Sequence, residues 1–307
     1  MSSQPTPDQR ARTARTVAEL RAALAPARRE GLTIGLVPTM GALHEGHLSL
    51  VARAREQCDL VVVSLFVNPA QFDERSDLER YPRSEEHDAE LAAGAGADVL
   101  FAPSAEEVYP PGFATAVEVL GVTDRLEGVV RGAEHFRGVT TVVTKLLCMA
   151  MPEIAYFGQK DAQQVVVVRR LVRDLNLPVR IEVCPTVREP DGLALSSRNA
   201  LLSPDERERA LAIPAALDAA CESAATGERS ADALLQAARE AMLSFDVEPE
   251  YLALVDPETL EPRETLARES LLAVGARIGE VRLIDNAILR PPVTPIPRQP
   301  LQRKAIA

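Results

Sequence analysis

Two histidines that lie three residues apart give the strongest chemical signal in this sequence. His44 and His47 follow Gly41 in the segment 37–47, between an apolar run and a helical pattern. At that spacing two imidazoles share one face of a first helical turn and can donate hydrogen bonds to phosphate oxygens. The backbone N–H groups of a strand-to-helix junction also favour anions. Two other interpretations stay open on spacing alone: an ordinary structural or solvated pair, and a zinc site, for which the H-E-x-x-H spacing is absent.

Two further polar clusters carry groups that suit a triphosphate. The segment 157–161, Phe-Gly-Gln-Lys-Asp, again follows an apolar run, and Lys160 supplies a mobile positive charge. The segment 195–199, Leu-Ser-Ser-Arg-Asn, follows a Pro-Asp-Gly turn, and its two hydroxyls and the guanidinium of Arg198 can clamp an oxyanion. Each cluster taken singly is also explained as a solvated loop. Three of them at loops and junctions together predict an anion-binding site.

An alternation of extended and helical patterns must position these clusters. From about residue 16 to about residue 184, buried runs typical of strands are separated by segments with helical spacing. We expect strands at 32–37, 60–67, 98–101, 154–157 and 179–183, and helices from Thr16 and at 48–58, 84–93, 139–149 and 162–175. Strands separated by helices predict an α/β fold with a parallel sheet flanked by helices, whose ligand lies beyond the carboxyl ends of the strands.

The pattern changes after residue 187. A helix is expected to begin after Ser203, with Pro204 at its first position, and a second helix at about 230–244. Short extended runs follow at 251–255, 271–276 and 281–284. We therefore expect one domain over 1–186, a smaller α+β C-terminal domain over 187–290, and a proline-rich, disordered tail over 291–307.

Composition excludes several classes of partner. The chain has 34 Lys and Arg against 45 Asp and Glu, a net charge of −11, which argues against a general binder of nucleic acid or of anionic membranes. The four cysteines are far apart in apolar surroundings, as in a protein with reduced thiols. No secretory signal is visible, and the apolar runs are too short to cross a bilayer. We therefore expect a cytoplasmic protein.

The clusters together resemble the superfamily of nucleotidylyltransferases and related synthetases, which carries HIGH-type and KMSKS-type signatures. His44-Glu45-Gly46-His47 is similar to the first signature and Ser196-Ser197-Arg198-Asn199 to a variant of the second. Neighbouring motifs narrow the resemblance to the pantothenate synthetase family, over about 16–290. These motifs are Pro38-Thr39-Met40-Gly41, the segment 66–72, Tyr81-Pro82-Arg83, the segment 157–161 with Gln163-Gln164, and Val187-Arg188-Glu189.

This resemblance implies a reaction and its participants. ATP and pantoate would form a pantoyl-adenylate and pyrophosphate, and β-alanine would then displace AMP to give pantothenate. It also implies Mg²⁺, a homodimer, and a Rossmann-like N-terminal domain that binds ATP and pantoate. The substrates would be held without any nucleophile from the protein, so alignment and charge stabilisation carry the catalysis. Closure of the C-terminal domain or of the loop 71–83 would keep water from the adenylate.

The resemblance also implies roles for individual residues. His44, His47, Lys160 and Arg198 would be catalytic, with His47 as proton donor, and no residue is assigned to a metal. Gln71 and Gln164 would hold pantoate, and Gln71 would help to place β-alanine. The residues implied around ATP are Met40, Gly41, Ala42, Leu43, His44, Glu45, Gly46, His47, Gly158, Gln159, Lys160, Asp161, Val187, Leu195, Ser196, Ser197 and Arg198. Gln159 and Leu195 depart from the family, which commonly has Glu and Met there.

Three rival functions fit the same residues less well. A nucleotidylyltransferase acting on a phosphate monoester would need a cationic acceptor pocket, whereas the acceptor region carries Asn68, Gln71 and Gln164. A non-catalytic nucleotide-binding module would not need both histidines together with Lys160 and Arg198. A zinc hydrolase would be supported by stoichiometric zinc.

Overall fold

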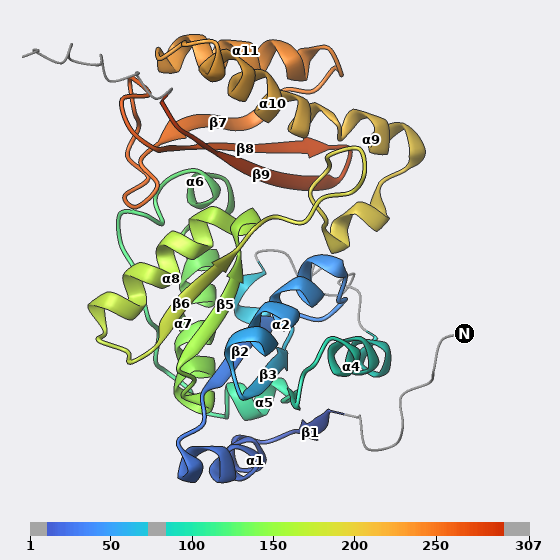
Figure 1. Ribbon diagram of the computed structural model, residues 1–307, viewed down its shortest axis with the longest axis vertical. Helices are drawn as coiled ribbons and strands as arrows, with labels where there is room; N and C mark the ends of the chain where they lie inside the picture. The colour runs from blue at the N-terminus through green and yellow to red at the C-terminus, as the bar shows by residue number, and fades with distance from the viewer. Residues whose placement is uncertain (1–10, 73–83, 292–307) are drawn as a thin grey trace, which may run out of the picture.

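The computed structural model describes residues 11–72 and 84–291 of the chain. Its larger part is a six-stranded sheet in the order β1-β4-β3-β2-β5-β6, in which every neighbouring pair is parallel (Figure 1). The strands are β1 (Arg12–Ala14), β2 (Ile34–Thr39), β3 (Leu60–Leu65), β4 (Val99–Phe101), β5 (Ile154–Gly158) and β6 (Arg180–Cys184). The prediction of a parallel sheet is confirmed, and β1 is an additional edge strand that the sequence pattern did not indicate.

The strand order reverses between β2 and β5. From β2 the chain continues to β3 and β4 on one side, while β5 and β6 extend the sheet on the other side. A reversal of this kind leaves a crevice at the carboxyl ends of the two central strands, which is where α/β proteins of this type bind their ligands. The first two polar clusters follow β2 and β5 directly, so both are delivered to this crevice.

Helices cover both faces of the parallel sheet. Alternate strand residues divide between two cores, because successive side chains of a strand point to opposite faces. Helices α1 (Val17–Glu30), α7 (Ala133–Ala150) and α8 (Ala162–Asp174) contribute to one core, which contains Leu36 and Phe157. Helices α2 (Glu45–Gln57) and α4 (Glu85–Gly94) contribute to the other, with Val37 and Tyr156.

The helix boundaries follow local signals closely where a cap is present. Thr16 and Glu19 form the expected capping box of α1, and Gly31 ends the helix with a φ of 70°. Helix α7 is longer than the expected 139–149, and the short helices α5 (Ala105–Val108) and α6 (Glu127–Arg131) were not expected. Among the described residues, no helix is long and apolar enough to cross a membrane.

The C-terminal unit is a three-stranded antiparallel sheet with helices on one face. It comprises α9 (Pro204–Arg209), α10 (Ala212–Ala225), α11 (Ala231–Leu243), β7 (Pro249–Val255), β8 (Ser270–Ile278) and β9 (Val281–Leu289). Ser203 caps α9 as predicted, but α10 is a separate helix that was not expected. The smaller α+β unit is confirmed, and we propose the boundary to the first unit at residue 187.

Both faces of the C-terminal sheet are covered. Helices α10 and α11 pack against one face, and its other face lies on the parallel-sheet unit through a core that joins Leu271 and Ala273 to Ala162 and Val166 (Figure 1). Burial of apolar surface on both faces therefore holds the C-terminal sheet over the end of α8. The expected tail lies almost entirely, from residue 292, outside the described residues, as does most of the loop 71–83.

Candidate active site

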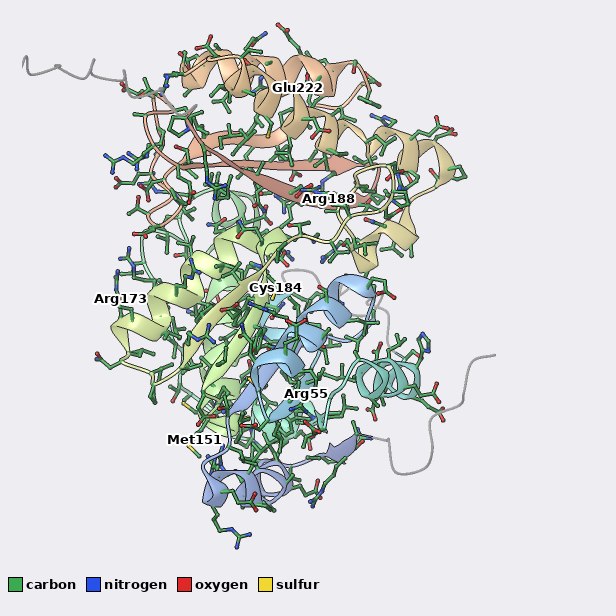
Figure 2. All side chains as sticks on the ribbon, viewed as in Figure 1. Arg55, Met151, Arg173, Cys184, Arg188 and Glu222 are labelled. Carbon is green, nitrogen blue, oxygen red and sulfur yellow. The ribbon has the colours of Figure 1, made fainter. Side chains whose placement is uncertain are left out.

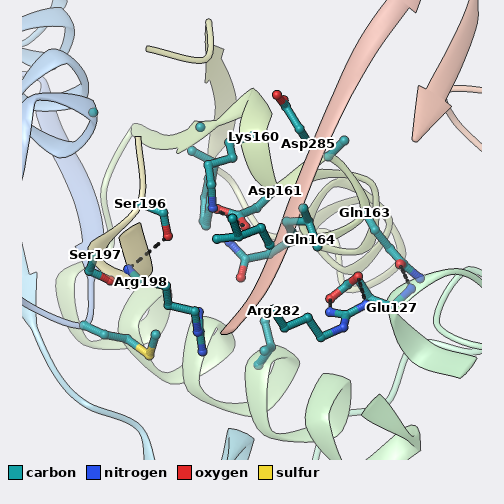
Figure 3. Close-up of a pocket in the computed structure, with 18 of the residues that line it drawn as sticks. Glu127, Lys160, Asp161, Gln163, Gln164, Ser196, Ser197, Arg198, Arg282 and Asp285 are labelled. Atoms are coloured by element: carbon teal, nitrogen blue, oxygen red, sulfur yellow. Dashed lines mark hydrogen bonds and ion pairs between the residues drawn. The ribbon is translucent and has the colours of Figure 1, made fainter. Parts of the chain in front are cut away.

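A cavity of about 840 Å³ lies between the carboxyl ends of the central strands and the C-terminal sheet. Its wall brings together the three polar clusters with side chains from β8 and β9. Figure 3 shows Lys160 and Asp161 facing Ser196 and Arg198 across this space, with Gln164 between them. Segments that are more than 100 residues apart in the chain thus form one polar site.

The two histidines are locked in one tautomer by backbone donors. The N–H of Gly46 donates to His44 Nδ1 at 3.1 Å, and the N–H of His44 donates to His47 Nδ1 at 3.4 Å. Because a backbone N–H can only donate, each Nδ1 must accept, and each neutral ring carries its proton on Nε2. Both rings line the cavity, with their centroids 4.1 Å apart. The pair therefore has two Nε2–H groups left to donate to a ligand.

Burial and neighbouring charge keep both rings neutral. Burial, followed by the charges of His44 and Lys160, lowers the pKa of His47 to about 3. Burial also lowers the pKa of His44, with a second contribution from Lys160. At neutral pH the two rings are therefore hydrogen-bond donors that carry no charge, and the positive charges on the cavity wall belong to lysine and arginine side chains, among them Lys160 and Arg198.

Two backbone N–H groups of the first loop are already bonded to a carboxylate. Asp88, which is buried at the N-terminal part of α4, accepts from Ala42 N at 2.9 Å and from Leu43 N at 2.8 Å. These two N–H groups are therefore not available to a bound anion, and the anion site expected at this junction stays a prediction for its other donors. A carboxylate from a helix 45 residues further along the chain binds these two groups instead, and a local sequence pattern could not indicate it.

The second cluster forms the short helix η3 (Gln159–Asp161) directly after β5. Lys160 is largely buried, with 22% of its side chain exposed, and its Nζ lies 3.9 Å from Asp161 Oδ1. Gln159 does not line the cavity, and its amide donates to Asn286 of β9 at 2.9 Å.

The third cluster begins a short helix, η4 (Ser197–Leu201). Ser196 Oγ accepts from the N–H of Arg198 at 3.2 Å and caps this helix, and Figure 3 shows the guanidinium extending into the cavity. The N–H of Leu195 donates to Val187 O at 3.0 Å. That bond joins two residues that the resemblance implied around ATP and places both on the cavity wall.

Most of the expected site residues meet at this cavity. The predicted residues that line it are Met40, His44, Gly46, His47, Gln71, Gly158, Lys160, Asp161, Gln164, Val187, Leu195, Ser196, Ser197 and Arg198. Gly41, Ala42, Leu43, Glu45 and Gln159 do not line it. They support the loops that carry the others.

Gln71 is oriented by a chain of hydrogen bonds. Asn68 is 1% exposed; its Nδ2 donates to Gly138 O at 3.1 Å, and its Oδ1 accepts from Ala70 N at 3.3 Å. These partners fix the amide of Asn68, so its Nδ2 must face Gln71 Oε1, at 3.0 Å. The Gln71 NH₂ group is thereby left for the Sδ of Met40, at 3.0 Å, and for a ligand.

Tyr109 completes this chain, and sequence reasoning missed it. Its hydroxyl donates to Asn68 Oδ1 at 2.8 Å. Burial raises the pKa of Tyr109 to about 12, although the bond to Asn68 acts in the other direction, so the hydroxyl keeps its proton and remains a donor at neutral pH. No local pattern relates a tyrosine at 109 to an amide 41 residues earlier.

His135 is a second residue that the sequence analysis missed. It lines the cavity from α7, is 9% exposed, and its Nδ1 lies 2.8 Å from Gln71 O. A carbonyl can only accept, so Nδ1 carries the proton and Nε2 is an acceptor. Burial, followed by the charge of Arg131, lowers the pKa of His135 to about 4.

This buried histidine predicts a loss of stability in mild acid. Its pKa is about 4 when folded and about 6.5 when unfolded, so the unfolded chain binds more protons between these values and stability falls as pH falls through that window. Between pH 7 and pH 5 we expect His135 to account for a loss of about 2 kcal/mol in the free energy of unfolding. His135→Asn keeps a donor at the Nδ1 position without titrating. Urea unfolding at both pH values should show a smaller loss in this variant, and an equal loss would contradict the prediction.

Comparison with known proteins gives the family. A family model described as pantoate-beta-alanine ligase matches residues 12–288. The pantothenate synthetase of Moorella thermoacetica is 52% identical over 275 residues, covering 89% of this chain and 97% of that protein. The crystal structure of pantothenate synthetase from Thermus thermophilus superposes with a TM-score of 0.87 at 50% identity, covering 91% of this chain and 100% of the other. The crystal structure of pantoate-beta-alanine ligase from Francisella tularensis superposes with a TM-score of 0.76 at 34% identity, covering 91% of this chain and 97% of the other.

These matches run over nearly the whole of both chains, so they concern the complete two-unit fold. They confirm the resemblance seen in the motifs and set aside the nucleotidylyltransferase, the non-catalytic module and the zinc hydrolase as functions. The chain therefore belongs to the pantoate-beta-alanine ligase family, enzymes that condense pantoate with β-alanine at the expense of ATP.

Proposed function

We propose that the cavity carries out both half-reactions of this condensation. A carboxylate oxygen of pantoate attacks the α-phosphorus of ATP, the bond from that phosphorus to the bridging oxygen breaks, and pyrophosphate leaves. The amine of β-alanine then attacks the acyl carbon, the bond from that carbon to the oxygen of AMP breaks, and the amine loses a proton. The convergence of His44, His47, Lys160 and Arg198 on one cavity is the observation that carries this proposal.

The relatives support the choice of substrates. The Francisella tularensis ligase was solved in complex with β-γ ATP and β-alanine. In the present chain the cavity carries two kinds of polar group, the cations of Lys160 and Arg198 and the neutral amides of Gln71 and Gln164. The first suits a triphosphate and the second suits the hydroxyls and carboxylate of pantoate.

The histidines would act as neutral donors. A pKa of about 3 leaves almost no imidazolium of His47 at neutral pH, so we propose that its Nε2–H donates a hydrogen bond to phosphate oxygens instead of transferring a proton as a charged acid. The Nε2–H of His44, the N-cap residue of α2, would also donate to phosphate oxygens. Donors that are held in place before the reaction stabilise developing charge without reorganisation, an effect worth about 3–4 kcal/mol for one donor in favourable sites.

Mg²⁺ fits this site as an ion held chiefly by the substrate. Among the described residues there is no group of three or more His, Cys, Asp or Glu side chains arranged to hold a metal. Mg²⁺ commonly binds through phosphates and one or two carboxylates, and Asp161, with 46% of its side chain exposed at the cavity, would supply one. When bound, the ion would neutralise charge on the triphosphate.

We also propose a homodimer in the cytoplasm, as expected for this family. Leu120 and Val129 are 77% and 74% exposed, and large apolar side chains of this kind are suited to burial between subunits. Light scattering of the purified protein measures the mass in solution, and a monomer at micromolar concentration would contradict the dimer.

Isotope exchange between ATP and pyrophosphate tests the proposed function. Purified protein with Mg²⁺ is expected to show exchange that requires pantoate and does not require β-alanine, because the first half-reaction is complete without the amine. A nucleotide-binding protein without the ligase activity would bind ATP and show no exchange. Exchange that appeared only after addition of β-alanine would contradict a separate adenylate step.

The hydrogen-bond chain to Gln71 predicts a specific effect of Tyr109→Phe. Loss of the hydroxyl leaves Asn68 Oδ1 with one bond fewer and lets the amides of Asn68 and Gln71 turn, so the KM for pantoate should rise about 5–10-fold, the equivalent of one net hydrogen bond. The KM for ATP should stay within about twofold, because Tyr109 acts through Asn68 on Gln71, which we place at pantoate and not at the triphosphate. A rise of equal size in both KM values would contradict the positional role.

A further inference from the structure

Strand β9, the last strand of the described residues, contacts the turn that carries Lys160. Asn286 of β9 is 5% exposed, and its Nδ2 donates to Gln159 O at 2.8 Å and to Lys160 O at 3.0 Å. Its Oδ1 accepts from Gln159 Nε2 at 2.9 Å. One side chain from the C-terminal sheet thus makes three hydrogen bonds to η3, about 126 residues away in sequence.

These bonds allow one arrangement of the two amides. Both carbonyl oxygens can only accept, so Asn286 must present its NH₂ group to them and its oxygen to Gln159. The backbone of η3 is short and follows β5 directly, with no side-chain cap of its own. Its two carbonyls are therefore satisfied from another unit of the structure, and the position of Lys160 depends on that unit.

Asp285, the residue before Asn286, joins β9 to the segment that contains Arg188. Asp285 is 2% exposed, accepts from the N–H of Asn286 at 2.8 Å, and accepts two bonds from Arg188, at 2.5 and 3.1 Å. Arg188, which lies beside β9 in Figure 2, belongs to the segment that leads to Ser196 and Arg198. Adjacent residues of one strand thus hold both cationic segments of the cavity.

We propose that Asn286 is a positioning residue for Lys160. Through its hydrogen bonds to the carbonyls of Gln159 and Lys160, Asn286 fixes the position of η3 relative to the C-terminal sheet. The position of η3 in turn determines where the Lys160 ammonium lies in the cavity. This inference rests on the proposed role of Lys160 in the adenylate step and adds a residue of the cavity wall that lies outside the loop motifs. It also gives the C-terminal unit a task beyond covering the site.

A double-mutant cycle tests the proposal with the full-length protein. Asn286→Asp keeps the size of the side chain but places a carboxylate oxygen against two carbonyls, and Asn286→Ala removes the donors without adding charge. Each is expected to slow pantoate-dependent exchange about 10–100-fold, since a misplacement of about 1 Å has effects of that size. In the Lys160→Ala background the same changes should slow exchange less than about threefold, because Asn286 acts through Lys160.

Controls separate this role from folding and from the proposed function. Asn176→Asp adds the same charge at an exposed position after α8 and should leave exchange unchanged. Urea unfolding checks that each variant is folded, and Asn286→Ala serves where Asn286→Asp does not fold. Additive losses in the cycle, or wild-type rates in folded Asn286 variants, overturn the positioning role. Failure of the wild-type protein to exchange at all overturns the proposed function instead.

Discussion

Lys160→Met is expected to slow pantoate-dependent ATP–pyrophosphate exchange by about 10²–10³-fold while the protein remains folded. The methionine fills the space of the lysine stem but removes the charge, which we place beside the leaving pyrophosphate. The Lys160 ion pair with Asp161 is long, at 3.9 Å, so its loss should change the free energy of unfolding by less than about 1 kcal/mol. Rapid-quench measurement of adenylate formation gives the rate of the step concerned.

Two further variants test whether the charge at position 160 accounts for the loss of rate. Lys160→Arg keeps the charge on a planar, larger group and should recover only part of the rate. Arg173→Met removes a cation from the far part of α8, where 66% of the side chain is exposed (Figure 2), and should leave the rate unchanged. Near-normal adenylate formation in Lys160→Met would remove this residue from the mechanism.

Arg282→Met is expected to lower the free energy of unfolding by about 3–5 kcal/mol, the usual effect of removing one partner from a buried ion pair. Arg282 donates two hydrogen bonds to Glu127 of α6, at 2.5 and 2.7 Å, and a further bond to Glu250. The side chains of Arg282 and Glu127 are 13% and 9% exposed (Figure 3). Without the guanidinium, the buried carboxylate of Glu127 loses two charged hydrogen bonds and keeps the hydrogen bond of Tyr251 and the more distant charge of Arg131. Urea unfolding at pH 7 measures the loss.

The matched control shares a partner with Arg282. Arg277 also binds Glu250 but is 54% exposed, so Arg277→Met should cost less than about 1 kcal/mol. The double variant Arg282→Met with Glu127→Gln should recover a large part of the loss, because the buried negative charge is gone. An equal loss in both single arginine variants would contradict the importance of burial at Arg282.

The sign of the pH dependence follows from the same pair. Burial raises the pKa of Glu127, but the hydrogen bonds and charge of Arg282 outweigh this and leave the pKa below its ordinary value of 4.5. A depressed pKa contributes stability above the ordinary value and loses it as pH falls through the folded value. The contribution of this pair therefore persists at neutral pH and disappears only in acid below about pH 4.5.

The sequence by itself determined the fold class and the polar clusters. Strand and helix periods are local, so the parallel-sheet unit from residue 16 onwards, the capped starts of α1 and α9, and the delivery of His44, His47 and Lys160 to strand ends could all be predicted. The edge strand β1 and the helix α6 were not predicted. Strand β4 is as short as β1, but all three of its residues are buried and give an apolar run, whereas only one residue of β1 is buried, and the two buried residues of α6 are Glu127 and Gly128.

Only the tertiary structure decided which groups of the site are free and which are already bonded. Asp88 takes the N–H groups of Ala42 and Leu43, and Tyr109 acts through Asn68 on Gln71. Asn286 holds the carbonyls beside Lys160. Each of these bonds to Asp88, Tyr109 and Asn286 joins residues about 40 to 127 positions apart, and such pairing is set by how helices and the C-terminal sheet pack, for which a local pattern carries no signal.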